Sequence, residues 1–120
     1  MQLEEDKTLT YGEVDFNSIV EIIFFCKKQY GLKSESVFWD LGHGTGKVLI
    51  SAALSGLFSK VKGIELLHEL WRESENLKVG YQFYSERDSN LNCEFQTILG
   101  DFLVNDWSDG DFILLNSTCY

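Results

Sequence analysis

Residues 37–46 read Val37-Phe-Trp-Asp-Leu-Gly-His-Gly-Thr-Gly46, and this stretch decides the fold. Its first five residues form a short apolar run, which predicts a buried strand. The three glycines that follow allow a sharp turn and leave no side chain between the backbone and a ligand. A helical pattern begins at Lys47, so the start of that helix presents free N–H groups to the same turn. The stretch therefore predicts a strand, a ligand-binding turn and a helix.

The rest of the chain continues this alternation of strands and helices. Apolar residues spaced three and four apart predict helices over residues 15–31, 47–57 and 67–84. Short apolar or alternating runs predict strands over residues 37–41, 61–65, 93–99 and 111–116. Strands alternating with helices indicate a parallel α/β sheet, and such sheets bind ligands at the carboxyl ends of their strands. Residues 1–15 are polar and are predicted to be irregular.

Length and composition limit the possible classes of protein. The chain has 120 residues, of which 44% are hydrophobic, so it is long and apolar enough for one folded domain. Its net charge of −9 opposes nucleic-acid binding through phosphate contacts. No apolar run reaches membrane-spanning length, so no membrane partner is expected. Cys26, Cys93 and Cys119 lack the spacing of a zinc site or a disulfide framework, which favours a reducing intracellular compartment.

Three ligand patterns compete for the glycine stretch. The dinucleotide fingerprint G-x-G-x-x-G, started at Gly42, requires glycine at the position of Lys47. The phosphate-binding loop G-x-x-x-x-G-K-[ST] fails at Leu41 and at Val48, where its magnesium ligand would stand. The third pattern, acidic-x-G-x-G-x-G, is complete and begins at Asp40. The alternative to all three is a strand-to-helix turn that binds no ligand.

Carboxylates close the next two predicted strands. Glu65 ends the second strand about 20 residues beyond Gly46, where an acidic residue accepts hydrogen bonds from ribose hydroxyls. Asp101 follows the third strand, where a carboxylate can accept from an adenine amine while Phe102 packs on the adenine face. Each acid alone could be an ordinary surface residue. Their placement at successive strand ends favours a single site.

The pattern that Asp40 leads resembles motif I of the class I S-adenosylmethionine (SAM) methyltransferases. The resemblance implies SAM as the cofactor. It also implies a Rossmann-like parallel sheet with helices on both faces, here ending after the fourth strand, so that residues 1–120 form one partial SAM-binding domain. In that fold the segment after the fourth strand is catalytic. This implies that Asn116 orients a substrate amine and that Tyr120 lines the acceptor channel.

Further motifs make the chain similar to one family within this class, the non-SET histone lysine methyltransferases named for disruption of telomeric silencing. The similarity extends from Thr10 to Tyr120 and rests on Thr10-Tyr-Gly-Glu13, residues 37–46, Gly63-Ile-Glu65, Gly100-Asp-Phe-Leu103 with Trp107, and Leu115-Asn116. It implies that the loop of Glu13 covers the methionine end of SAM. It further implies the cofactor-binding residues Tyr11, Glu13, Asp40, Gly42, His43, Gly44, Gly46, Glu65, Asp101 and Phe102.

The family resemblance implies methyl transfer from SAM to a lysine amine of a basic protein such as a histone, in the nucleus and without a metal. Two alternatives are a cytoplasmic class I methyltransferase that acts on a small molecule, RNA or another protein, and a SAM-fold binding protein without catalysis. His43 and His68 are expected in surface or loop positions, so neither is a convincing general base. Catalysis would then depend on alignment of donor and acceptor and on exclusion of water.

Overall fold

The computed structural model describes residues 16–31, 33 and 35–115. The elements are, in order, α2 (Phe16–Tyr30), β1 (Val37–Leu41), α3 (Lys47–Ser55), β2 (Lys60–Glu65), α4 (His68–Ser85), β3 (Glu94–Leu99) and β4 (Phe112–Leu115). The predicted helices and strands are confirmed in type and order. None of the helices in this part of the chain combines the length and apolar character needed to cross a bilayer.

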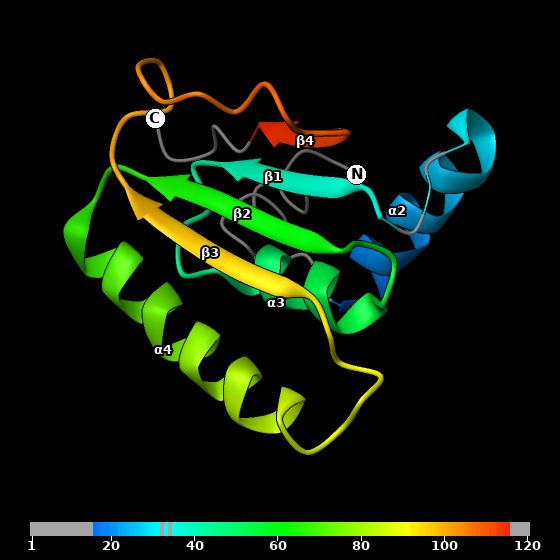
Figure 1. Ribbon diagram of the computed structural model, residues 1–120. Helices are drawn as coiled ribbons and strands as arrows, with labels where there is room; N and C mark the ends of the chain where they lie inside the picture. The colour runs from blue at the N-terminus through cyan, green and yellow to red at the C-terminus, as the bar shows by residue number, and fades with distance from the viewer. Residues whose placement is uncertain (1–15, 32, 34, 116–120) are drawn as a thin grey trace, which may run out of the picture.

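The four strands form one parallel sheet in the order β3-β2-β1-β4 (Figure 1). Strand β1 is central, and its Asp40 lies opposite Gly63 of β2 and Leu114 of β4. The chain moves outward from β1 to β3 and then returns to the other side of β1. The strand order therefore reverses between β1 and β4, and ligands of open α/β sheets bind at such a reversal.

Helices α2, α3 and α4 pack on one face of the sheet. Their buried residues share a core cluster with Phe38 of β1, Val61 of β2 and Phe95 of β3. Right-handed crossovers that move in the same direction across a sheet place their helices on the same face. Helices were predicted on both faces of the sheet. Among the described residues, they cover one face only.

The connection from β3 to β4 covers the opposite face. Trp39, Leu41 and Ile64 point to this face and pack with Phe102 and Trp107 of the connection. The indole N–H of Trp107 donates to the carbonyl oxygen of Phe102 at 2.8 Å, which fixes the backbone next to Asp101.

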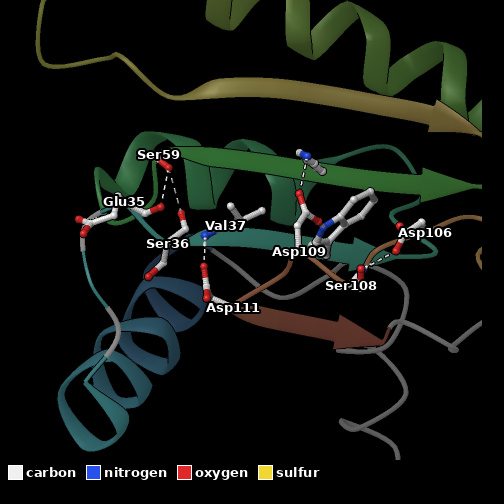
Figure 2. Close-up of polar contacts among 10 residues, drawn as sticks. Glu35, Ser36, Val37, Ser59, Asp106, Ser108, Asp109 and Asp111 are labelled. Carbon is white, nitrogen blue, oxygen red and sulfur yellow. Dashed lines mark hydrogen bonds and ion pairs between the residues drawn. The ribbon is translucent and has the colours of Figure 1, made fainter.

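Polar contacts tie the end of the same connection to the sheet (Figure 2). The carboxylate of Asp109 accepts from Trp39 Nε1 at 2.6 Å and from Lys62 Nζ at 2.7 Å. Two residues later, Asp111 accepts from the backbone N–H of Val37 at 2.9 Å. The connection that carries Asp101 is therefore held at both ends against β1 and β2.

Candidate functional site

The glycine loop, residues 42–46, joins β1 to α3 at the carboxyl edge of the sheet (Figure 1). Gly42, Gly44 and Gly46 have φ values of 82°, 58° and 96°, in the left-handed region that favours glycine. The backbone N–H groups of Gly42 and His43 donate to the carbonyl of Ile64 at 2.7 and 3.2 Å. The predicted sharp turn is confirmed, and β2 anchors it.

The last two glycines of the loop have different surroundings. A Cβ on Gly46 would lie 3.0 Å from the Cβ of Ser74 in α4, so close packing requires this glycine. A Cβ on Gly44 would meet no atom within 4 Å. Gly44 therefore borders open space at the carboxyl edge, where a ligand could approach the backbone.

Glu65 ends β2 and bonds to the glycine loop. Its side chain is only 4% exposed. One carboxylate oxygen accepts from the N–H of Gly44 at 2.7 Å, and the other accepts from the N–H of Leu67 at 3.0 Å. A carboxylate can accept about four hydrogen bonds. Glu65 therefore retains acceptor capacity for a pair of ligand hydroxyls.

Asp40 lies in β1 and is fully buried. Its side chain is 0% exposed, and neither carboxyl oxygen has a hydrogen-bond partner. Burial, and secondarily the negative charge of Glu65, raise the pKa of Asp40 to about 8. The carboxyl group therefore holds its proton at neutral pH.

His43 lies in the glycine loop, as expected, but its side chain is buried and not on the surface. Its Nε2 lies 3.0 Å from the hydroxyl of Ser74, which itself donates to the carbonyl of Trp71 at 2.6 Å. Ser74 therefore accepts from His43 Nε2–H. Burial lowers the pKa of His43 to about 4, although Glu75 opposes this shift, so the ring is neutral near pH 7. His68, in contrast, is exposed as expected.

Ser74 was not among the predicted site residues. It is fully buried in α4, where its Cβ contacts the position of Gly46 and its hydroxyl binds His43. The signal in the sequence was a small polar residue in the apolar stripe of a predicted helix. Such a residue requires a polar partner when it is buried.

Asp101 and Phe102 reach the same edge from the end of β3. A small pocket there is lined by Gly42, Ile64, Leu66, Gly100, Asp101 and Phe102. The carboxylate of Asp101 accepts from the N–H of Leu103 at 2.9 Å, which closes a turn. The glycine loop and the Gly100–Leu103 turn therefore share one pocket.

The structure brings the described candidate residues to one edge of the sheet. Asp40 and His43 lie on its helix-covered side, while Gly42, Asp101 and Phe102 line the pocket. Four other predicted residues lie outside the described residues, namely Tyr11, Glu13, Asn116 and Tyr120. No group of three or more potential metal ligands gathers within residues 16–31, 33 and 35–115.

The described strands and helices have the Rossmann-like fold of solved methyltransferases. One similar solved structure is coclaurine N-methyltransferase bound to N-methylheliamine and SAH, with a TM-score of 0.53 and 17% identity over 82% of this chain and 27% of that chain. Another is a putative tRNA (m1A22) methyltransferase of Streptococcus pneumoniae, with a TM-score of 0.51 and 14% identity over 73% of this chain and 39% of that chain. At these identities the likeness concerns the fold alone.

Comparison of the sequence identifies a family within this fold. The family described as "Histone methylation protein DOT1" matches residues 3–118. The H3 lysine-79 specific histone-lysine N-methyltransferase of Drosophila melanogaster is 30% identical over 105 residues, which cover 88% of this chain. The chain belongs to the DOT1 histone methylation family. It spans 6% of the length of the Drosophila protein.

Proposed function

We propose that this chain binds SAM at the carboxyl edge of its sheet and serves methyl transfer to a lysine amine of a histone, in the nucleus. The observation that carries the proposal is the hydrogen bond from the N–H of Gly44 to the carboxylate of Glu65. This bond joins the glycine loop to the predicted ribose acceptor, and Gly44 borders open space where a ligand could lie. The histone acceptor is supported by family membership and by the net charge of −9, which suits a basic protein partner.

The residues present fit the chemical groups of SAM. The family motif assigns the ammonium group to Asp40, whose carboxyl oxygens lack hydrogen-bond partners, and the spare acceptor capacity of Glu65 suits the ribose hydroxyls. Phe102 and Leu66 supply apolar surface for the adenine ring in the pocket, where Asp101 offers an acceptor for its amine. Except for Leu66, which lines the pocket, these assignments follow the family motif residue by residue.

SAM would supply a methyl group on a sulfonium, and the chain's own residues would bind and orient it. The attacking lysine amine must be neutral, although its ordinary pKa is about 10.4. His43 is buried and its Nε2 donates to Ser74, so the proposal gives it no part in accepting the lysine proton. Asn116 would orient the amine and Tyr120 would line its channel. The chain then contributes alignment and exclusion of water rather than general-base catalysis.

We expect Gly44→Ala to lose most of its SAM affinity and methyl transfer. The variant's small loss of folding stability would not account for a loss of this size. The added methyl group would enter the open space beside the loop, and the left-handed backbone costs an alanine about 1–2 kcal/mol. Gly56 is the matched control. Like Gly44 it has a positive φ, of 75°, and open surroundings, but it lies at the far end of α3, where it is the C-cap.

Calorimetric titration with SAM and transfer of labelled methyl groups to nucleosomes measure both variants. Gly56→Ala should keep wild-type binding and histone labelling, whereas Gly44→Ala should lose most of both. Equal SAM affinities in the two variants would refute the role of the loop. SAM binding by the wild type with labelling of RNA or small molecules, and none of histones, would refute the acceptor. Binding without any transfer would support the non-catalytic alternative.

A further inference from the structure

Ser74 is a fully buried residue of α4 whose hydroxyl faces the glycine loop. The hydroxyl donates to the carbonyl oxygen of Trp71 within the helix and accepts from His43 Nε2–H. A buried hydroxyl requires such partners, and here one of the two belongs to the loop of the candidate SAM site. The side chain of Ser74 therefore connects α4 to that loop.

The imidazole ring of His43 is enclosed between β2 and α4. On one side its Nδ1 lies against Gly63 of β2, where a Cβ would be only 2.4 Å away. On the other side its Nε2 lies 3.0 Å from the hydroxyl of Ser74. Close packing leaves such a ring little room to move while both contacts are present. The bond to Ser74 therefore helps to set where His43 lies.

The backbone of His43 extends this control to the rest of the loop. Its N–H donates to the carbonyl of Ile64, and its carbonyl accepts from the N–H of Gly46 at 3.0 Å. The next residue, Gly44, donates its N–H to the carboxylate of Glu65 at 2.7 Å. The residue that α4 holds is therefore the immediate neighbour of the N–H that orients the predicted ribose acceptor.

Position 74 has two requirements that serine meets together. A Cβ on Gly46 would lie 3.0 Å from the Cβ of Ser74, so α4 and the loop approach each other closely and residue 74 must be small. The donor on His43 requires an acceptor at the same place. Alanine would meet the first requirement but not the second.

We propose that Ser74 is a positioning residue, which acts through His43 and Gly44 to hold the carboxylate of Glu65 in the orientation that recognises the ribose of SAM. The inference rests on the proposed SAM site. Hydrogen bonds weaken steeply with poor distance or angle, so a displaced loop should impair the bonds of Glu65 to ribose hydroxyls. Contacts to the adenine ring come from the Gly100–Leu103 turn and do not depend on this bond.

Isothermal titration of the full chain with two ligands tests this role. The ligands are S-adenosylhomocysteine and its 2′-deoxyribose analogue, which differ by one hydroxyl, so the ratio of their affinities reports ribose recognition. We expect the analogue to bind the wild type roughly 10- to 100-fold more weakly, because it lacks a hydrogen bond to a charged group. Ser74→Ala should reduce this difference to about threefold or less, because a misaligned bond contributes little.

Tyr81→Phe is the matched control. It also removes one buried hydroxyl from α4, since the Tyr81 hydroxyl accepts from the N–H of Cys93 at 3.0 Å. Helix α4 begins at the carboxyl edge of the sheet and leads to the amino end of β3, so this bond lies far from the glycine loop (Figure 1). A general loosening of α4 would affect both variants. Only the loss of positioning should change the ratio in Ser74→Ala and leave it unchanged in Tyr81→Phe.

The possible failures can be told apart. A wild-type ratio in Ser74→Ala, or an equal fall in both variants, would overturn the positioning role and leave the SAM site intact. Absence of binding by either ligand to the folded wild type would overturn the proposed function itself. His43→Leu removes the donor of the same bond and should lower the ratio as Ser74→Ala does. An unchanged ratio in that variant would also overturn the role, even if Ser74→Ala did not fold.

Discussion

Asp40→Asn is expected to stabilise the folded chain at pH 7 by up to about 4 kcal/mol, less the cost of burying the unpaired amide N–H groups. The native carboxyl holds its proton up to about pH 8, whereas in the unfolded chain it ionises near its ordinary value of 3.8. Between these two values the native state binds more protons than the unfolded state, so the stability of the wild type falls as the pH rises. Asparagine does not titrate, and the variant escapes this loss.

The stabilisation should grow with pH. Each pH unit between about 5.5 and about 7.5 should widen the gap between variant and wild type by about 1.4 kcal/mol. Urea unfolding of both proteins in this range measures it, and the range lies above the isoelectric point near 4.5. A gap that does not change with pH, or a variant less stable than the wild type throughout, would contradict the protonated state of Asp40. A residue that destabilises the fold but binds a ligand is expected at a functional site.

Gly63→Ala is expected to destabilise the chain by about 3 kcal/mol and to displace the glycine loop. Gly63 is buried in β2, where a Cβ would lie 2.4 Å from His43 Nδ1 and 2.6 Å from Leu49 Cδ1. The absence of a side chain at this position makes room for the His43 ring. The added methyl group must push the ring away, and the bond from His43 to Ser74 should be lost.

Gly80→Ala is the control for this substitution. Gly80 lies within α4, and a Cβ there would meet no atom within 4 Å. Alanine should stabilise the helix at this position by up to about 1 kcal/mol, because glycine is a poor helix former. Thermal and urea unfolding compare the two variants with the wild type. If Gly63→Ala were as stable as Gly80→Ala, the packing of His43 against β2 would be wrong.

The order of elements could be predicted because it depends on local patterns. The apolar spacing over residues 67–84 and the short run of residues 37–41 each lie within one element, and the structure places α4 and β1 there. The glycine loop was equally predictable, since its residues are contiguous. The acids at successive strand ends followed from the rule that parallel strands present their carboxyl ends at one edge.

The contacts beneath the loop could not be predicted from such patterns. The His43–Ser74 bond joins residues 31 positions apart, and the Trp39–Asp109 bond joins residues 70 positions apart. The sequence shows that residue 40 is an aspartate, but it does not show that its carboxyl oxygens lack hydrogen-bond partners. That depends on how the strands and α3 pack around the side chain. The one-sided helical layer also escaped prediction. The connection that crosses the other face is a loop of turns and not a helix.

The most direct test of the SAM site is calorimetric titration of the chain with SAM, with Glu65→Gln and Glu73→Gln in parallel. Glu73 is an exposed acid on α4 and is therefore a control for charge alone. We predict saturable binding at one site, weakened by about 1.5–3 kcal/mol in Glu65→Gln through loss of charge-assisted hydrogen bonds and unchanged in Glu73→Gln. Absence of binding by the folded wild type, or the same affinity in all three proteins, would contradict the account.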